Sequence, residues 1–133
     1  MERKWIYFGV FLVKESRNKL QKLASKVVLD NWKLYCHHMT IAFNNGSEQS
    51  TELYEFYKNY FGARTEIIAT HIGISDDAVA VKVQFNGETL NKTPHVTLAT
   101  PIGGKPVNSN NIQTWARLKQ PIKLIGIFSE FKK

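Results

Sequence analysis

The chain is poor in cysteine and has no long apolar run. Its 133 residues include one cysteine, Cys36, so an intrachain disulfide is excluded and a cytoplasmic location is expected. No stretch approaches the about 18 consecutive apolar residues of a transmembrane helix, so no membrane association is expected. The composition also offers no low-complexity linker, and the length suits one hydrophobic core. We therefore predict a single domain over residues 1–133.

Acidic residues are the minority among the charged side chains. The sequence has 18 Lys and Arg against 11 Asp and Glu, which gives a net charge of +7 and a pI of about 9.6. A basic balance favours a polyanionic partner, because phosphate groups bind Lys and Arg. A soluble basic protein without such a partner is the alternative, and charge alone does not separate the two.

Hydrophobic periodicity predicts a mixture of strands and helices. Residues 5–13 form a continuous apolar, β-prone run, which indicates a buried strand. Apolar residues at helical spacing predict two amphipathic helices, at 16–29 and 50–61. Shorter β-prone segments between turn residues complete the pattern. The remaining predicted elements are strands at 38–43, 66–74, 78–85, 95–99 and 122–128, and a short helix at 109–118.

One short pattern occurs twice, each time inside a predicted strand. HMTI begins at His38 and HVTL begins at His95. Alternate side chains of a strand point to the same face, so each strand would present an imidazole and a hydroxyl together. The intervening apolar residues would then face the core. Two such strands side by side would gather four polar groups: His38, Thr40, His95 and Thr97.

This quartet suits the cleavage of a phosphodiester. Imidazole has an unperturbed pKa near neutrality. One histidine can therefore accept a proton from the attacking oxygen while the other donates a proton to the leaving oxygen. The threonine hydroxyls can bind the non-bridging phosphate oxygens. Such a reaction needs no cofactor, and the other histidines and Cys36 lie at no recognised metal-ligand spacing, so we expect no metal site.

The two segments HHMTIAF and PHVTLAT resemble the two-histidine (2H) phosphoesterase superfamily, which is defined by two His-apolar-Thr/Ser-apolar motifs. The resemblance implies an α+β fold, with two pseudo-symmetric, mostly antiparallel sheets flanked by helices around a central groove in a compact, bilobal domain. It also implies that His38 and His95 are the catalytic acid/base pair and that Thr40 and Thr97 bind the phosphate. The resemblance does not say which histidine is the acid.

Two further residues are candidates for substrate contacts. In some members of the superfamily an aromatic residue three positions after the first Thr stacks on a base, and Phe43 occupies that place. Strict strand alternation, however, predicts that Phe43 faces the core. Lys105 follows a glycine pair in the loop after the second motif, where it could reach a phosphate, although a solvated lysine is the simpler interpretation. We interpret His37, His71 and Cys36 as structural residues.

The resemblance implies two alternative functions, and the basic charge adds a third. The first is metal-independent hydrolysis of 2′,3′-cyclic phosphates at RNA ends or on nucleotides, as in tRNA repair enzymes. The second is cleavage of 2′-5′ oligoadenylates or cyclic dinucleotides by a viral or phage immune antagonist. The third is a non-catalytic RNA-binding module. We expect a monomer whose partner is an RNA end or a small nucleotide.

Overall fold

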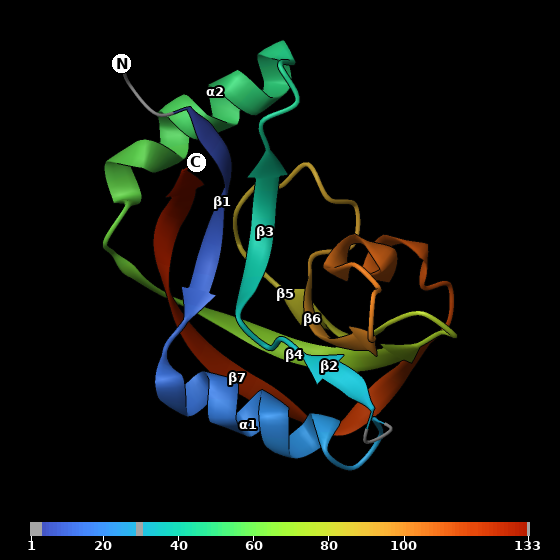
Figure 1. The fold of residues 1–133 in the computed structure, drawn as a ribbon. Helices are drawn as coiled ribbons and strands as arrows, with labels where there is room; N and C mark the ends of the chain where they lie inside the picture. The colour runs from blue at the N-terminus through green and yellow to red at the C-terminus, as the bar shows by residue number, and fades with distance from the viewer. Residues whose placement is uncertain (1–3, 29–30, 133) are drawn as a thin grey trace.

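The protein folds around one antiparallel β-sheet of seven strands (Figure 1). The computed structural model describes residues 4–28 and 31–132. Neighbouring strands pair in the order β2-β6-β3-β1-β7-β4-β5, and β5 also pairs with β6. The strands are β1 (Trp5–Leu12), β2 (Trp32–Leu34), β3 (His38–Phe43), β4 (Arg64–Ile74), β5 (Val79–Gln84), β6 (His95–Pro101) and β7 (Trp115–Lys132).

The additional β5–β6 pairing closes six of the strands into a barrel, with β2 added at the side of β6. The α+β class is therefore confirmed. Among the described residues all seven strands join one sheet, so the expectation of two separate sheets is wrong. The two pseudo-symmetric lobes stay a prediction. The closure between β3 and β6 is narrow, with the single register pair Met39–Val96.

Two helices lie against the barrel, α1 (Lys14–Ala24) and α2 (Glu48–Tyr57). The side chain of Ser47 accepts a hydrogen bond from the Ser50 backbone N–H, which caps the start of α2. A short 3₁₀-helix, η1 (Lys58–Tyr60), continues from α2. Both helices begin two residues earlier than the periodicity predicts. Within the described ranges, no helix is long and apolar enough to span a membrane.

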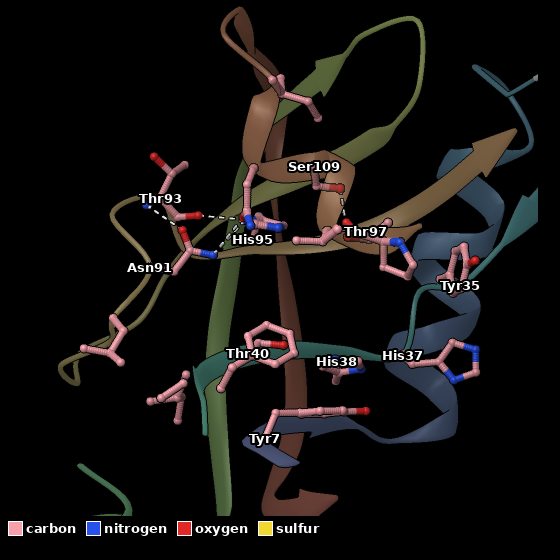
Figure 2. Close-up of a pocket in the computed structure, with 18 of the residues that line it drawn as sticks. Tyr7, Tyr35, His37, His38, Thr40, Asn91, Thr93, His95, Thr97 and Ser109 are labelled. Carbon is pink, nitrogen blue, oxygen red and sulfur yellow. Dashed lines mark hydrogen bonds between the residues drawn. The ribbon is translucent and has the colours of Figure 1, made fainter. Parts of the chain in front are cut away.

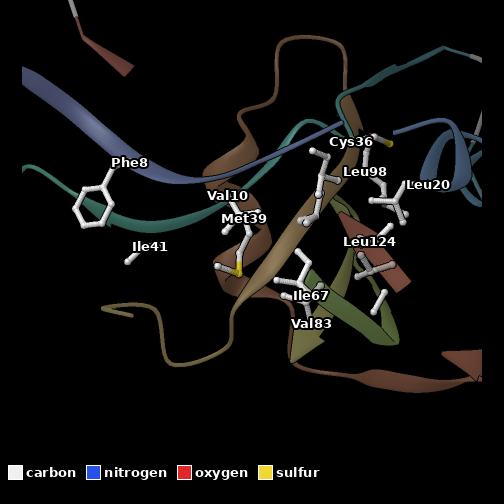
Figure 3. Close-up of a cluster of buried hydrophobic side chains, with 14 of the residues drawn as sticks. Phe8, Val10, Leu20, Cys36, Met39, Ile41, Ile67, Val83, Leu98 and Leu124 are labelled. Atoms are coloured by element: carbon white, nitrogen blue, oxygen red, sulfur yellow. The ribbon is translucent and has the colours of Figure 1, made fainter. Parts of the chain in front are cut away.

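The barrel interior is filled by apolar side chains (Figure 3). Phe8 and Val10 of β1 are fully buried and belong to the same apolar cluster as Ile67 of β4 and Leu124 of β7. The apolar residues of both motifs also face inward, as the alternation predicts, and are fully buried: Met39, Ile41, Val96 and Leu98. The motif strands are therefore fixed from behind by the core, which leaves their other face available.

The region after β6 differs most from the sequence prediction. A 3₁₀-helix, η2 (Pro106–Asn111), replaces the first part of the helix predicted at 109–118, and Trp115 already begins β7. The pairing of β7 with β4 is interrupted between Arg117 and Ile122. Pro121 lies in this interruption, where its missing N–H costs no ladder hydrogen bond. The short strand β2 was not predicted.

Candidate active site

The two motifs meet where β3 and β6 pair. The antiparallel register Met39–Val96 places His38 opposite Thr97 and Thr40 opposite His95. Because Met39 and Val96 face the core, the four polar residues share the other face. Each histidine therefore lies beside the threonine of the other motif, and the two histidines are related by a diagonal.

All four residues line one cavity of about 920 Å³ (Figure 2). This volume is at the upper end of the range of about 300–1,000 Å³ that is typical of small-molecule sites. The cavity floor comes from β1, β3 and β6, and the 3₁₀-helix η2 forms a further wall. The structure therefore brings together the four residues that the sequence singled out, in a space large enough for a nucleotide.

His38 lies in an aromatic environment. Its ring stacks on Tyr7 at a centroid distance of 4.9 Å and on Phe11 at 5.2 Å. Burial, with smaller contributions from the nearby His37 and His95, lowers the pKa of His38 from 6.5 to about 4. Removing water from around the ring penalises its charged form. His38 is therefore neutral at pH 7, the state that a general base requires.

His95 is held by a backbone hydrogen bond instead. Its Nδ1 lies 2.8 Å from the carbonyl oxygen of Thr93, which accepts the bond. The proton is therefore on Nδ1 in the neutral ring, and Nε2 is the nitrogen left for a substrate. Burial lowers the pKa of His95, and the bond to Thr93 partly opposes this by favouring the protonated form. The two histidines are thus held differently: His38 by stacked aromatic rings, and His95 by a backbone carbonyl.

The threonines also differ. Thr40 is partly exposed in the cavity, whereas Thr97 is buried and only 8% exposed. The Thr97 hydroxyl lies 2.8 Å from the Ser109 hydroxyl and 3.2 Å from the Pro106 carbonyl oxygen. Both partners belong to η2. The 3₁₀-helix is therefore bonded directly to the second motif.

Phe43 lies on the cavity side, not on the core side that strict alternation predicts. Between Phe8–Ala42 and Gly9–Thr40 the register of β1 and β3 shifts, so that β3 contains one extra residue there. Such a bulge interrupts the alternation of side chains. As a result Phe43 is 50% exposed and lines the cavity.

Gly9 lies at this bulge and is required by the close approach of the two strands. A Cβ atom at Gly9 would lie 2.0 Å from the carbonyl oxygen of Met39. No heavy-atom contact of that length is tolerated, so any larger residue would push β3 away. The position of the first motif thus depends on a glycine in the neighbouring strand.

Lys105 is exposed and does not belong to the cavity lining, whereas Lys33 and Lys92 do. Lys33 also lies over the ring of Tyr35, at 5.2 Å from its centroid. These two lysines were missed, because nothing in their local sequence links them to the motifs. Ser109 is not among the predicted site residues, because the sequence predicts a helix over residues 109–118.

The other reactive residues behave differently. His37 is exposed and lines the cavity, so it does not lie in the core; its interpretation as a structural residue stays a prediction. Cys36 is fully buried, and burial raises its pKa to about 11. His71 is outside the cavity and its Nδ1 contacts the Thr70 hydroxyl at 2.8 Å. Among residues 4–28 and 31–132, no group of three His, Cys, Asp or Glu side chains is placed to hold a metal ion.

Comparison with known proteins adds information on the fold. No protein-family model matches the chain, and no curated protein matches it significantly. Among solved structures, a fungal RNA kinase superposes with a TM-score of 0.70 at 14% identity over 96% of this chain. The protein TT0787 of Thermus thermophilus superposes with a TM-score of 0.54 at 15% identity, covering 97% of both chains.

At these identities the likeness concerns the fold and does not assign an activity. The chain spans 45% of the length of the fungal RNA kinase.

Proposed function

We propose that the protein is a metal-independent phosphodiesterase that hydrolyses 2′,3′-cyclic phosphates at RNA ends or on nucleotides. The observation that carries the proposal is the diagonal arrangement of two histidines and two threonines on one face of the β3–β6 pair. The similarity in fold to an RNA kinase supports RNA or a nucleotide as the substrate class.

The two histidines differ in a way that suggests their roles. His38, with its pKa lowered to about 4, is the general base and accepts the proton of the attacking water. The new P–O bond forms as the bond from phosphorus to one ribose oxygen breaks. We assign to His95, whose pKa burial lowers and the Thr93 carbonyl partly restores, the donation of a proton to that leaving oxygen.

The threonines hold the phosphate during this exchange. Thr40 and Thr97 lie beside opposite histidines, so their hydroxyls can bind the two non-bridging oxygens while attack and departure occur in line. A positively charged His95 and neutral donors are sufficient for a phosphodiester with one negative charge. Phe43 would stack on the base, and Lys33 and Lys92 would attract neighbouring phosphates; no such contact is proposed for Lys105.

Cleavage of 2′-5′ oligoadenylates or cyclic dinucleotides is the second candidate. The cavity of about 920 Å³ supports it, because this volume lies near the upper end of the range typical of small-molecule sites. The same four residues would serve that reaction. The choice between the two depends on the substrate and not on the catalytic groups.

The experiment is a comparison of turnover for a 2′,3′-cyclic nucleotide, a 2′-5′ oligoadenylate and a cyclic dinucleotide, each in excess EDTA. We expect His38→Ala and His95→Ala each to lower kcat by at least about a hundredfold. His71→Ala is the matched control, because His71 lies outside the cavity. Loss of wild-type turnover in EDTA would refute the metal-independent mechanism. If the protein binds RNA but turns over no substrate, the non-catalytic RNA-binding module would replace the proposed phosphodiesterase.

A further inference from the structure

The contact between Ser109 and Thr97 joins η2 to a residue of the second motif. Ser109 is 1% exposed, yet it lines the cavity (Figure 2). Its hydroxyl lies 2.8 Å from the Thr97 hydroxyl, and either oxygen can donate in that bond. The 3.2 Å contact from Thr97 to the Pro106 carbonyl is different, because a carbonyl oxygen only accepts.

The positions of the two protons follow from this difference. Thr97 has one hydroxyl proton, and it donates that proton to Pro106. The short bond between the hydroxyls must then use the proton of Ser109, with Thr97 as the acceptor. In this arrangement Thr97 has no proton left for a phosphate oxygen. Phosphate binding therefore requires Thr97 to exchange the long bond to Pro106 for a bond to the substrate.

Ser109 makes that exchange directional. While Ser109 donates to Thr97, one lone pair of the Thr97 oxygen is occupied, and the Thr97 proton cannot turn toward Ser109. It can point only to the Pro106 carbonyl or into the cavity. A charged phosphate oxygen is the stronger acceptor and will take it. Without Ser109, the Thr97 hydroxyl would rotate freely between more orientations.

We infer that Ser109 is a positioning residue that orients the Thr97 hydroxyl toward the phosphate of the substrate. The inference rests on the proposed function and extends the phosphate site to η2. The same 3₁₀-helix also reaches the surroundings of His95, since the Asn91 side chain contacts Asn110 at 3.4 Å and the His95 ring at 3.4 Å. Ser109 acts only through Thr97 and need not touch the substrate.

The test is a double-mutant comparison of Ser109→Ala in three backgrounds, measured as kcat and KM on the preferred substrate. In the wild type and in Thr97→Ser, which keeps the hydroxyl, we expect Ser109→Ala to lower kcat/KM by about tenfold. In Thr97→Val, which lacks the hydroxyl, the same change should have an effect of less than about twofold. Equal losses in all backgrounds, or no loss in the wild type, would overturn the inference.

Asn108→Ala is the matched control, because it tests whether a general disturbance of η2 is enough to lower activity. Asn108 belongs to the same 3₁₀-helix, and its side chain bonds to the Asp77 carbonyl at 3.3 Å instead of Thr97. We expect it to keep activity within about twofold, whereas a loss of about tenfold would indicate that only the integrity of the helix matters. Thermal unfolding of every variant shows that the losses occur in folded protein.

Affinity for a nucleoside 2′-monophosphate, measured by calorimetry, separates this inference from the proposed function. If the wild type turns over no substrate, the proposed function fails. The role of Ser109 would still be supported if Ser109→Ala weakened binding of the monophosphate in the wild-type background and had no such effect in the Thr97→Val background. Equal affinities of Ser109→Ala and the wild type, or no binding by the wild type, would overturn it.

Discussion

The burial of His38 makes the stability of the protein depend on pH, with a magnitude that follows from the site. The folded chain holds this ring with its pKa lowered from 6.5 to about 4. Between these two values the unfolded chain binds the proton more readily than the folded one. The contribution of the neutral His38 ring to the unfolding free energy is therefore present in full above pH 6.5 and is lost as the pH falls toward 4.

The pKa difference corresponds to about 3 kcal/mol of unfolding free energy between the two limits. By about pH 5, roughly 2 kcal/mol of this contribution should already be lost. Burial lowers the pKa of His95 as well, so its contribution has the same sign. The loss is a large fraction of the about 5–15 kcal/mol that is typical of a folded domain.

Urea unfolding, followed by tryptophan fluorescence at about pH 7.5 and about pH 5, measures this effect. The comparison is with His38→Phe, which keeps an aromatic ring between Tyr7 and Phe11 but has no proton to gain. We expect the wild type to lose about 2 kcal/mol more than His38→Phe over this range. Equal losses in the two proteins would refute the conclusion that burial keeps His38 neutral.

Three further predictions concern the surroundings of the site. Gly9→Ala should lower the unfolding free energy by about 2–3 kcal/mol and also reduce turnover, because its Cβ would meet the Met39 carbonyl and displace β3; full stability in urea unfolding would contradict this. Phe43→Ala should raise KM about tenfold with little change in stability, whereas Phe131→Ala, similarly exposed at 48% but outside the cavity lining, should leave KM unchanged. Cys36, buried and with its pKa raised to about 11, should react with a thiol reagent only after denaturation; fast labelling at about pH 8 would count against the buried position.

Most of the secondary structure could be predicted from local pattern. The strand at residues 38–43 and the apolar faces of both motifs were predicted correctly, because burial on one side of a strand imposes period-two alternation. The helix predicted at 109–118 was wrong. Residues there contain apolar side chains at helical spacing, but Trp115 and its successors pair with β4, and that long-range pairing outweighs the local preference.

The composition of the candidate site follows from the sequence, and its geometry does not. The two His-x-Thr motifs identify four polar residues. Within each motif, strand alternation places the histidine and the threonine on the same face. The sequence already places His38 near Thr40, because both belong to the same motif. Only the register Met39–Val96 also places His38 beside Thr97 of the other motif. That register is a contact between residues far apart in the chain, which no local pattern specifies.

The tertiary structure also decided the parts of the site that lack a motif. Phe43 lies in the cavity because a bulge between β1 and β3 breaks the alternation, and Ser109 lies there because η2 packs against β6. Likewise, the neutral state of His38 comes from the rings of Tyr7 and Phe11, which reach it from another strand. The sequence by itself determined which chemical groups are present. Folding decided their neighbours, and the neighbours set the pKa values, proton positions and orientations on which the proposed reaction depends.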